Sequence, residues 1–122
     1  MSDREPLRVI EAARLFGEQV LDLVNHLPRR APSGLRGQLA EAAQAVSALL
    51  AEGFGRGTTG EKIHYSWMAN GSLEESQNYL RQCVNTHLTD RKTFFRAWNL
   101  SVATSRMIVN LIAHLERTKA DE

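Results

Sequence analysis

Glu61 and His64 come closest to a catalytic site by residue type and spacing, because they form a Glu-x-x-His motif. Four-helix bundles that hold a di-iron centre use two such motifs, one on each of two helices. Neither His87 nor His114 has a glutamate three positions earlier, so the chain has no second motif. We therefore predict no metal site and no cofactor. A metal-dependent enzyme is an alternative that bound stoichiometric iron or manganese would support.

Two further features that can support catalysis have structural explanations. Cys83 is the single cysteine and cannot form an intramolecular disulfide, and its position on an inward helix face suits a small hydrophobic residue. The glycine-rich segment GFGRGTTG at residues 53–60 follows a predicted helix and lacks the Gly-Lys-Ser/Thr ending of a phosphate-binding loop. We predict no catalytic residue and no enzymatic activity.

Basic residues offer a different chemistry, which is the binding of phosphate groups. The chain has 15 Lys and Arg against 14 Asp and Glu, a net charge of +1, so any basic surface must be local. Residues 28–56 and 89–122 each hold an excess of basic residues. The candidates for contacts to RNA or DNA are Arg29, Arg30, Arg36, Lys92, Arg96, Arg106 and Arg117. The alternative is that these residues form an ordinary solvated face. A symmetric oligomer would instead repeat the basic residues of each chain and build a larger patch.

Aromatic rings can also contribute to binding, because they stack on unpaired bases. The candidates are Tyr65, Trp67, Phe94, Phe95 and Trp98. Their spacing places most of them on inward helix faces, where burial of a ring stabilises a small core. We therefore expect core roles, with exposure only at Tyr65 and Trp67.

The elements that position these residues are predicted to be four helices. Glycine and proline, which break helices, cluster at residues 28–37 and 53–60, and a weaker break falls at residues 86–90. The expected helices cover about residues 3–27, 34–54, 59–87 and 90–118. Short connections between them predict an all-α, antiparallel up-down-up-down four-helix bundle. The 122 residues leave room for one domain, which we place at residues 1–122.

Start signals and apolar stripes support these helices. Capping boxes are expected at Ser2 and Thr58, a simple cap at Ser33, and the last start at residue 89 or 90. The first stripe has the spacing of one helix face and consists of Val9, Ala13, Phe16, Val20, Leu23 and Leu27. The next two consist of Leu35, Leu39, Ala42, Val46, Leu49 and Gly53, and of Tyr65, Ala69, Leu73, Ser76, Leu80, Cys83 and His87. We expect a neighbouring helix to pass close to Gly71, which interrupts the third helix.

The fourth predicted helix has an apolar arc that is wider than one bundle needs. An ordinary surface helix buries a stripe of only about 100°. Here the apolar arc extends past half of the circumference, so we expect another copy of the chain to cover the excess. The residues assigned to this oligomer interface are Leu100, Met107 and Leu111.

Three short segments resemble a known family. AEGFGR at residues 51–56, ANGSLEES at residues 69–76 and HLP at residues 26–28 are similar to the signature of four-helix bundle proteins encoded within intervening sequences of bacterial 23S ribosomal RNA genes. Similar proteins include the accessory variability protein of diversity-generating retroelements, a pentameric barrel that binds nucleic acid and a reverse transcriptase. The resemblance implies a homopentamer, a cytoplasmic bacterial origin and no established enzymatic activity.

Several residues match the motif positions of this family, namely Glu52, Gly53, Gly55, Arg56, Gly71, Ser72 and Glu75. We interpret them as structural. Gly53 and Gly55 suit the end of the second helix, where a positive φ is easily reached, and Phe54 can pack over the last turn. Glu52 and Glu75 are expected to pair with basic groups or helix ends.

These features predict a non-enzymatic oligomeric binding or scaffold protein that contacts RNA or DNA through a basic surface. The alternative is a protein–protein adaptor without nucleic-acid binding, in which an outer apolar patch docks the partner. No segment approaches the roughly 20 apolar residues that span a membrane, and the amino-terminal MSDREPLR lacks the apolar core of a signal peptide. We therefore expect a cytoplasmic protein without membrane contact.

Overall fold

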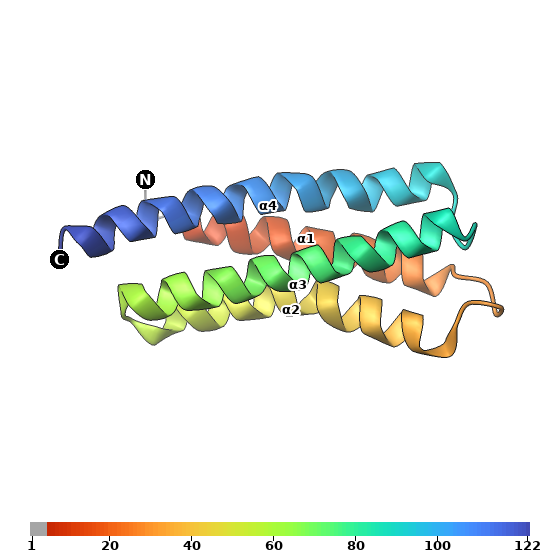
Figure 1. Ribbon diagram of the computed structural model, residues 1–122, viewed down its shortest axis with the longest axis horizontal. Coiled ribbons are helices and arrows are strands. Elements are labelled where there is room, and N and C mark those ends of the chain that lie inside the picture. Colours follow the sequence, from red (N-terminus) through yellow and green to blue (C-terminus); the bar gives the residue numbers. More distant parts are fainter. Residues whose placement is uncertain (1–4) are drawn as a thin grey trace.

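The computed structural model describes residues 5–122, and within this range it contains four helices and no strand. They are α1 (Glu5–Asn25), α2 (Ser33–Arg56), α3 (Thr59–Asn85) and α4 (Arg91–Ala120). Around the bundle, α1 packs against α2 and α4, and α3 packs against the same two helices. Figure 1 shows the helices side by side along one long axis. The predicted all-α, up-down-up-down four-helix bundle is confirmed.

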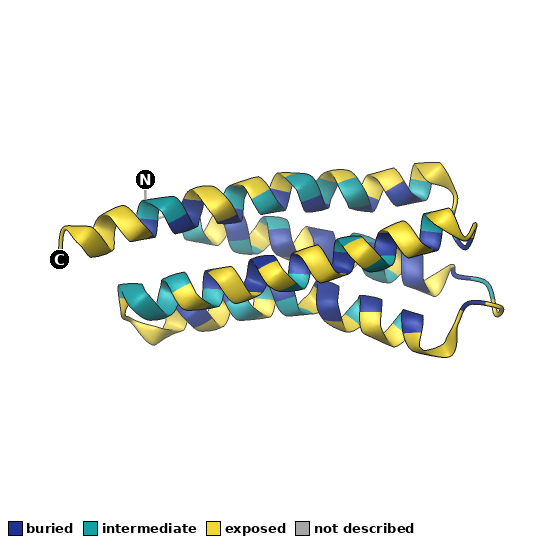
Figure 2. Ribbon diagram, viewed as in Figure 1, coloured by how far each residue is buried: buried dark blue, intermediate teal, exposed yellow. Residues whose placement is uncertain are grey.

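One stripe of each helix forms the core, and buried positions recur along all four ribbons in Figure 2. The whole predicted stripe of α1 is buried. The α2 stripe is buried except at Leu49, which is half-buried, whereas its neighbour Leu50 is fully buried. In α3 the stripe is buried from Ala69 to its end at Cys83, but Tyr65 is only half-buried and His87 lies exposed beyond the helix.

The interface between α3 and α4 is more polar than the rest of the core. The buried polar side chains of the described residues all lie on these two helices and are Ser66, Asn70, Ser76, Ser101 and Thr104. Ser105 Oγ donates to Asn70 Oδ1 at 3.3 Å, and Gln77 Nε2 donates to Ser101 Oγ at 2.9 Å. Because a buried polar group is costly without a partner, these bonds favour one register of α4 along α3.

The start signals of α3 and α4 are confirmed. The Thr58 hydroxyl accepts a hydrogen bond from the Glu61 amide at 3.2 Å, and the Asp90 carboxylate accepts one from the Thr93 amide at 2.6 Å. The second bond holds the pKa of Asp90 below its ordinary value, because it stabilises the charged carboxylate. Each cap satisfies an amide that the helix itself leaves without a partner.

Other helix boundaries differ from the prediction. The cap at Ser33 is wrong, because Pro32 precedes α2 without a side-chain cap and Ser33 is already helical. The helices α1 and α3 each end two residues earlier than predicted, and α2 and α4 each extend two residues further. The predicted cap at Ser2 lies outside the described residues.

Glycines at the corner between α2 and α3 act differently from the prediction. Gly53 and Gly55 lie inside α2, and the positive φ that ends this helix, 95°, belongs to Gly57. Gly53 is required by a close approach of two helices, since a Cβ there would lie 2.6 Å from the Cβ of Tyr65. A Cβ at Gly55 would meet no such neighbour within 4 Å.

The expectation for Gly71 is wrong. This residue is exposed on α3, and a Cβ there would meet no neighbouring atom within 4 Å. A glycine inside a helix costs about 1 kcal/mol relative to alanine. No contact within the single chain therefore compensates for the glycine at this position.

Substitutions at Gly53 and Gly71 should change the free energy of unfolding in opposite directions. Gly53→Ala should lower it by about 1 to 3 kcal/mol, because the Tyr65 Cβ is fixed to the α3 backbone and the helices must move apart. Gly71→Ala should raise it by about 1 kcal/mol, because the new methyl group has open space. Urea unfolding of the two variants checks both signs, and wild-type stability of Gly53→Ala would contradict the close contact.

Candidate nucleic-acid interface

Two connections lie at one end of the bundle, residues 26–32 between α1 and α2 and residues 86–90 between α3 and α4 (Figure 1). Arg30 Nη2 donates a hydrogen bond to the backbone oxygen of His87 at 2.8 Å and so joins the two connections. Arg29, the neighbour of Arg30, is exposed. The two arginines of the first connection therefore lie beside the start of α4.

The turn that leads from α3 into α4 depends on His87. Its φ of 59° lies in the left-handed region, where glycine is the usual residue. The His87 amide donates to the Val84 oxygen at 3.2 Å and the Leu88 amide donates to the Cys83 oxygen at 2.8 Å, which together form a Schellman motif. Leu88 is buried below this turn. The turn thus ends α3 and places Asp90 to cap α4.

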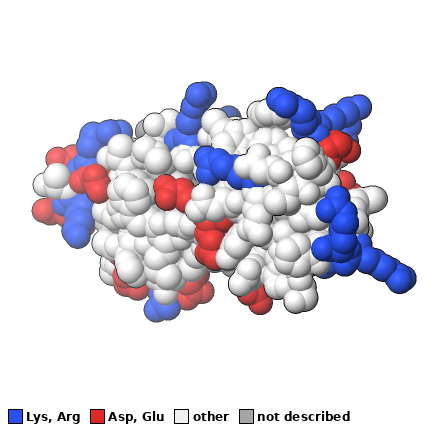
Figure 3. All heavy atoms as spheres, turned by 45° about the vertical axis from the view of Figure 1, so that its right-hand side comes forward, with Lys and Arg blue, Asp and Glu red and all other residues white. Residues whose placement is uncertain are grey.

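Exposed cations surround these connections. They form what we call the basic end, which consists of Arg29, Arg30, Arg81, Arg91, Lys92 and Arg96. Figure 3 turns this end of the bundle forward and shows Lys and Arg side chains projecting from it. Four of these six residues were predicted from the sequence. Arg81 and Arg91 were not, and they lie on the end of α3 and the first turn of α4.

The remaining predicted basic residues of α4 lie outside the basic end. Arg106 and Arg117 are exposed, but at 1.5 Å per residue they lie about 15 and 31 Å from Arg96 along the helix. The structure therefore divides the predicted basic stripe into one cluster and two separate cations.

Arg36, one of the predicted nucleic-acid contacts, makes hydrogen bonds within the chain. Its guanidinium donates to the backbone oxygens of Val24 at 3.0 Å, Leu27 at 2.9 Å and Pro28 at 2.6 Å. These carbonyls lie at and just beyond the end of α1, where the helix leaves oxygens without an amide partner. Arg36 thus fixes the connection that carries Arg29 and Arg30.

An aromatic cluster lies next to the basic end. The Phe94 ring is buried, stacks on Trp98 at a centroid distance of 5.4 Å and meets Phe95 edge-on at 4.9 Å. Arg81 lies over the Trp98 ring at 4.6 Å, and Arg91 lies 5.8 Å from the Phe95 centroid. Phe95 is 41% exposed, so its expected core role is wrong.

The two aromatic residues that were expected to be exposed differ from each other. Trp67 is exposed, at 51%. Tyr65 is half-buried, and its hydroxyl accepts a hydrogen bond from Arg56 Nη2 at 3.0 Å.

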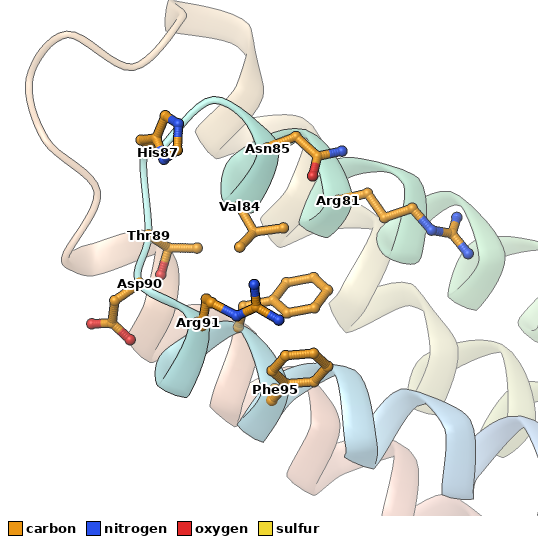
Figure 4. A pocket seen from close by; sticks show the side chains of 9 residues that line it. Arg81, Val84, Asn85, His87, Thr89, Asp90, Arg91 and Phe95 are labelled. Atoms are coloured by element: carbon orange, nitrogen blue, oxygen red, sulfur yellow. The ribbon is translucent and has the colours of Figure 1, made fainter.

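A cavity of about 700 Å³ opens between these groups (Figure 4). Its lining combines cations, aromatic rings and polar groups, namely Arg81, Val84, Asn85, His87, Thr89, Asp90, Arg91, Phe94 and Phe95. In Figure 4 the Arg91 side chain extends beside the ring of Phe95. The one carboxylate in this lining, that of Asp90, already accepts the α4 cap bond. The cavity therefore offers donors and ring surfaces to a ligand.

The remaining family-motif residues make contacts at the corner of α2 and α3. Arg56 Nη2 lies 3.0 Å from Glu52 Oε1, and Arg56 Nη1 lies 3.9 Å from Glu61 Oε2. Further along α3, Glu75 Oε1 accepts a bond from the Tyr79 hydroxyl at 3.4 Å. These contacts give the motif residues structural partners within the chain.

The structure also shows what surrounds the three groups that could support catalysis, which are Glu61, His64 and Cys83. Glu61 Oε1 accepts a hydrogen bond from the Thr58 hydroxyl at 2.9 Å, and His64 is exposed. Cys83 is buried, and burial raises the pKa of its thiol.

Across residues 5–122, no three His, Cys, Asp or Glu side chains gather where they could bind a metal ion. None of the described helices is both long enough and apolar enough to span a membrane.

These observations define a small helical bundle whose chemistry is concentrated in a cationic and aromatic end. The chain belongs to the 23S rRNA-intervening sequence protein family, which matches residues 5–110 and confirms the resemblance seen in the sequence.

A solved structure shares the fold. It is the crystal structure of a protein of unknown function from the S23 ribosomal protein family of Bacteroides thetaiotaomicron, with a TM-score of 0.83 and 14% sequence identity. The match covers 89% of this chain and 98% of that chain. No curated protein matches the chain. Neither the family description nor that of the solved structure names a biochemical activity.

The role of Arg36 is testable by stability. Arg36→Ala should lower the free energy of unfolding by about 1 to 3 kcal/mol, because three carbonyl oxygens lose their donor. Arg36→Lys should recover little of this loss, since an ammonium lacks the forked geometry of a guanidinium. Arg29→Ala is the matched control and should stay within about 0.5 kcal/mol of wild type in urea unfolding. An Arg36→Ala variant as stable as the control would contradict this structural role.

Proposed function

We propose that this protein is a non-enzymatic, oligomeric module that binds RNA or DNA through its basic end. The observation that carries the proposal is the convergence of cations from three parts of the chain. Arg30 reaches the oxygen of His87, while Arg81 and Arg91 line one cavity from α3 and α4. Exposed Lys and Arg side chains at this density suit the phosphate groups of a nucleic-acid backbone.

The electrostatics of this end favour a polyanion over a neutral ligand. Lys92 and Arg96 contribute to the lowered pKa of Asp90, after the hydrogen bond from Thr93, so their positive field acts on this turn. The net charge of the whole chain is only +1, which means that this field is local. Binding should therefore depend on close phosphate contacts, be weak for one copy and fall steeply with salt.

Oligomerisation is supported by two exposed apolar surfaces. The α1–α4 groove is lined in part by Leu7, Leu15 and Met107, of which Leu7 is 67% exposed. The α3–α4 patch consists of Trp67 and Val109, which are 51% and 45% exposed. The hydrogen bonds that set the α3–α4 register place Trp67 level with Val109 along the helices.

These surfaces lie on opposite sides of α4, since Met107 and Val109 are about 200° apart around the helix. A contact between two different surfaces is heterologous, and it generates a ring when the rotation between copies closes. This arrangement supports a closed cyclic assembly, in keeping with the pentamer implied by the retroelement protein. Of the residues assigned to the interface, Leu100 and Met107 are half-buried, but Leu111 packs in the core of its own bundle.

A protein–protein adaptor is the second candidate function, and Gly71 favours it. This glycine lies one helical turn from Trp67 and Met68 on the exposed side of α3, and space is open above it. A small residue between large apolar ones lets the backbone of a partner helix approach closely. In this alternative, the α3–α4 patch binds a different protein.

If nucleic acid binds at the basic end, removal of charges there should lower the salt dependence of binding more than removal of the same charge elsewhere on α4. Fluorescence anisotropy with hairpin RNA and duplex DNA at about 50 and 200 mM salt should show steeply weakening binding. Lys92→Gln with Arg96→Gln should weaken binding and lower the salt slope by about 2, because two phosphate contacts are removed. Arg106→Gln with Arg117→Gln removes the same charge away from the basic end and is the matched control. Equal slopes for both double variants would contradict a site at the basic end, and no binding at low salt would leave the adaptor function.

The proposed cyclic assembly is testable with two double variants, each of which alters one of the two apolar surfaces. Leu15→Glu with Met107→Glu alters the groove, whereas Trp67→Glu with Val109→Glu alters the patch. Each double variant should be a monomer by light scattering, because a charge in an apolar contact is costly. An equimolar mixture should form a dimer, since one intact groove and one intact patch remain. An unchanged oligomer for the patch variant would free the α3–α4 patch for a separate protein partner.

A further inference from the structure

The cavity at the basic end differs from a simple phosphate-binding surface, because it includes an exposed aromatic face. Phe95 is 41% exposed at its mouth, and the buried ring of Phe94 holds it from behind in an edge-on contact at 4.9 Å. Covering an exposed aromatic face is favourable, so the Phe95 ring offers a ligand apolar surface to stack on. The core of the bundle is complete without Phe95, which is absent from its buried cluster.

Two cations lie next to rings of the same aromatic cluster. Arg91 lies 5.8 Å from the Phe95 centroid, and Arg81 lies 4.6 Å from the Trp98 centroid on the neighbouring turn of α4. Arg91 is exposed, so its side chain can move when a ligand enters. A base can stack both on aromatic rings and on the plane of a guanidinium, and the adjacent phosphates pair with the same cations.

We infer that this cavity holds one unpaired nucleotide of a single-stranded RNA or DNA segment, with its base stacked on Phe95 and its phosphates on Arg81 and Arg91. The inference rests on the proposed function and specifies the kind of nucleic acid that the basic end prefers. A base inside a duplex cannot supply this contact, because its faces are covered by its neighbours. The unpaired bases of hairpin loops, bulges and strand ends can supply this stacking contact.

The rest of the lining fits the edge of a base. Asn85 at the end of α3 offers an amide donor and an acceptor, and the connection to α4 adds the Thr89 hydroxyl group and the His87 ring nitrogens. The Asp90 carboxylate accepts a hydrogen bond from the Thr93 amide and keeps its negative charge, so the phosphates must lie nearer to Arg81 and Arg91. A cavity of about 700 Å³ has room for one nucleotide.

The proposed ring leaves the cavity open. Phe95 lies about 21 Å along α4 from Val109, so a copy bound at the α3–α4 patch contacts the other half of the helix. Each copy in a ring would therefore present its own cavity to one strand.

The test compares single-stranded and duplex probes on variants of Phe95. The probes are a fluorescein-labelled oligouridylate, an oligoadenylate and a duplex of similar length, each titrated at fixed low salt. Phe95→Leu should weaken single-strand binding by about five- to 150-fold, the range expected for one stacked base, and change duplex binding less than twofold. Phe95→Trp keeps an aromatic face and should retain single-strand binding. Equal losses for both kinds of probe, or no loss with Phe95→Leu, would overturn the inference.

A second readout and a charge variant separate this inference from the proposed function. The chain has two tryptophans, so in a Trp67→Phe background the fluorescence reports Trp98, one turn from Phe95. Single strands should quench this signal and duplex should not; quenching by duplex alone would overturn the inference. Lys92→Gln with Arg96→Gln should weaken both probes, and if it weakens neither, the proposed function fails. Saturable quenching by uridine or adenosine monophosphate alone, with no tighter binding of the strands, would assign the cavity to free nucleotides instead.

Discussion

The bundle depends on the burial of one apolar stripe from each of four helices in a common core. Phe16, Leu39, Leu73 and Ile108 represent the four helices among the fully buried side chains. Because each stripe covers only part of a helix, the positions beside it are free to vary without loss of the core. In α4 these flanking positions carry apolar groups on both sides, which is why this one helix borders both exposed apolar surfaces.

The end of the bundle with two connections combines stability and proposed binding in a single arrangement. Arg36 satisfies the carbonyls at the end of α1, the Schellman turn ends α3, and Asp90 caps α4. These interactions order a segment that would otherwise be a flexible loop end. Cations mounted on ordered backbone lose less conformational entropy on binding than cations on mobile loops. The same guanidinium chemistry therefore serves two purposes here, because Arg36 is bonded to the end of α1 whereas Arg29 and Arg30 are exposed.

Much of the fold could be predicted from the sequence, because helical periodicity and capping residues are local signals. The α1 stripe and the caps at Thr58 and Asp90 are examples. Side-chain partners between elements could not be predicted. Arg36 looks like any other arginine until the end of α1 lies beside it, and Gly53 shows its close contact only when α3 is in place. Phe95 was predicted to lie in the core because spacing placed most of the aromatic residues on inward faces, but spacing does not show which edge of a wide apolar arc remains exposed.

The small net charge of the chain constrains how the proposed binding would work. A protein with a charge of +1 gains little from long-range attraction, so its affinity must come from contacts made at short distance. Phosphate contacts are weakened by salt, whereas stacking on a ring is much less so. A site that combines both retains part of its affinity at physiological ionic strength. Repetition of this site around a ring would raise the effective concentration of each contact, because a strand held by one copy is already near the next. Assembly would thus supply the affinity that the charge of a single chain does not.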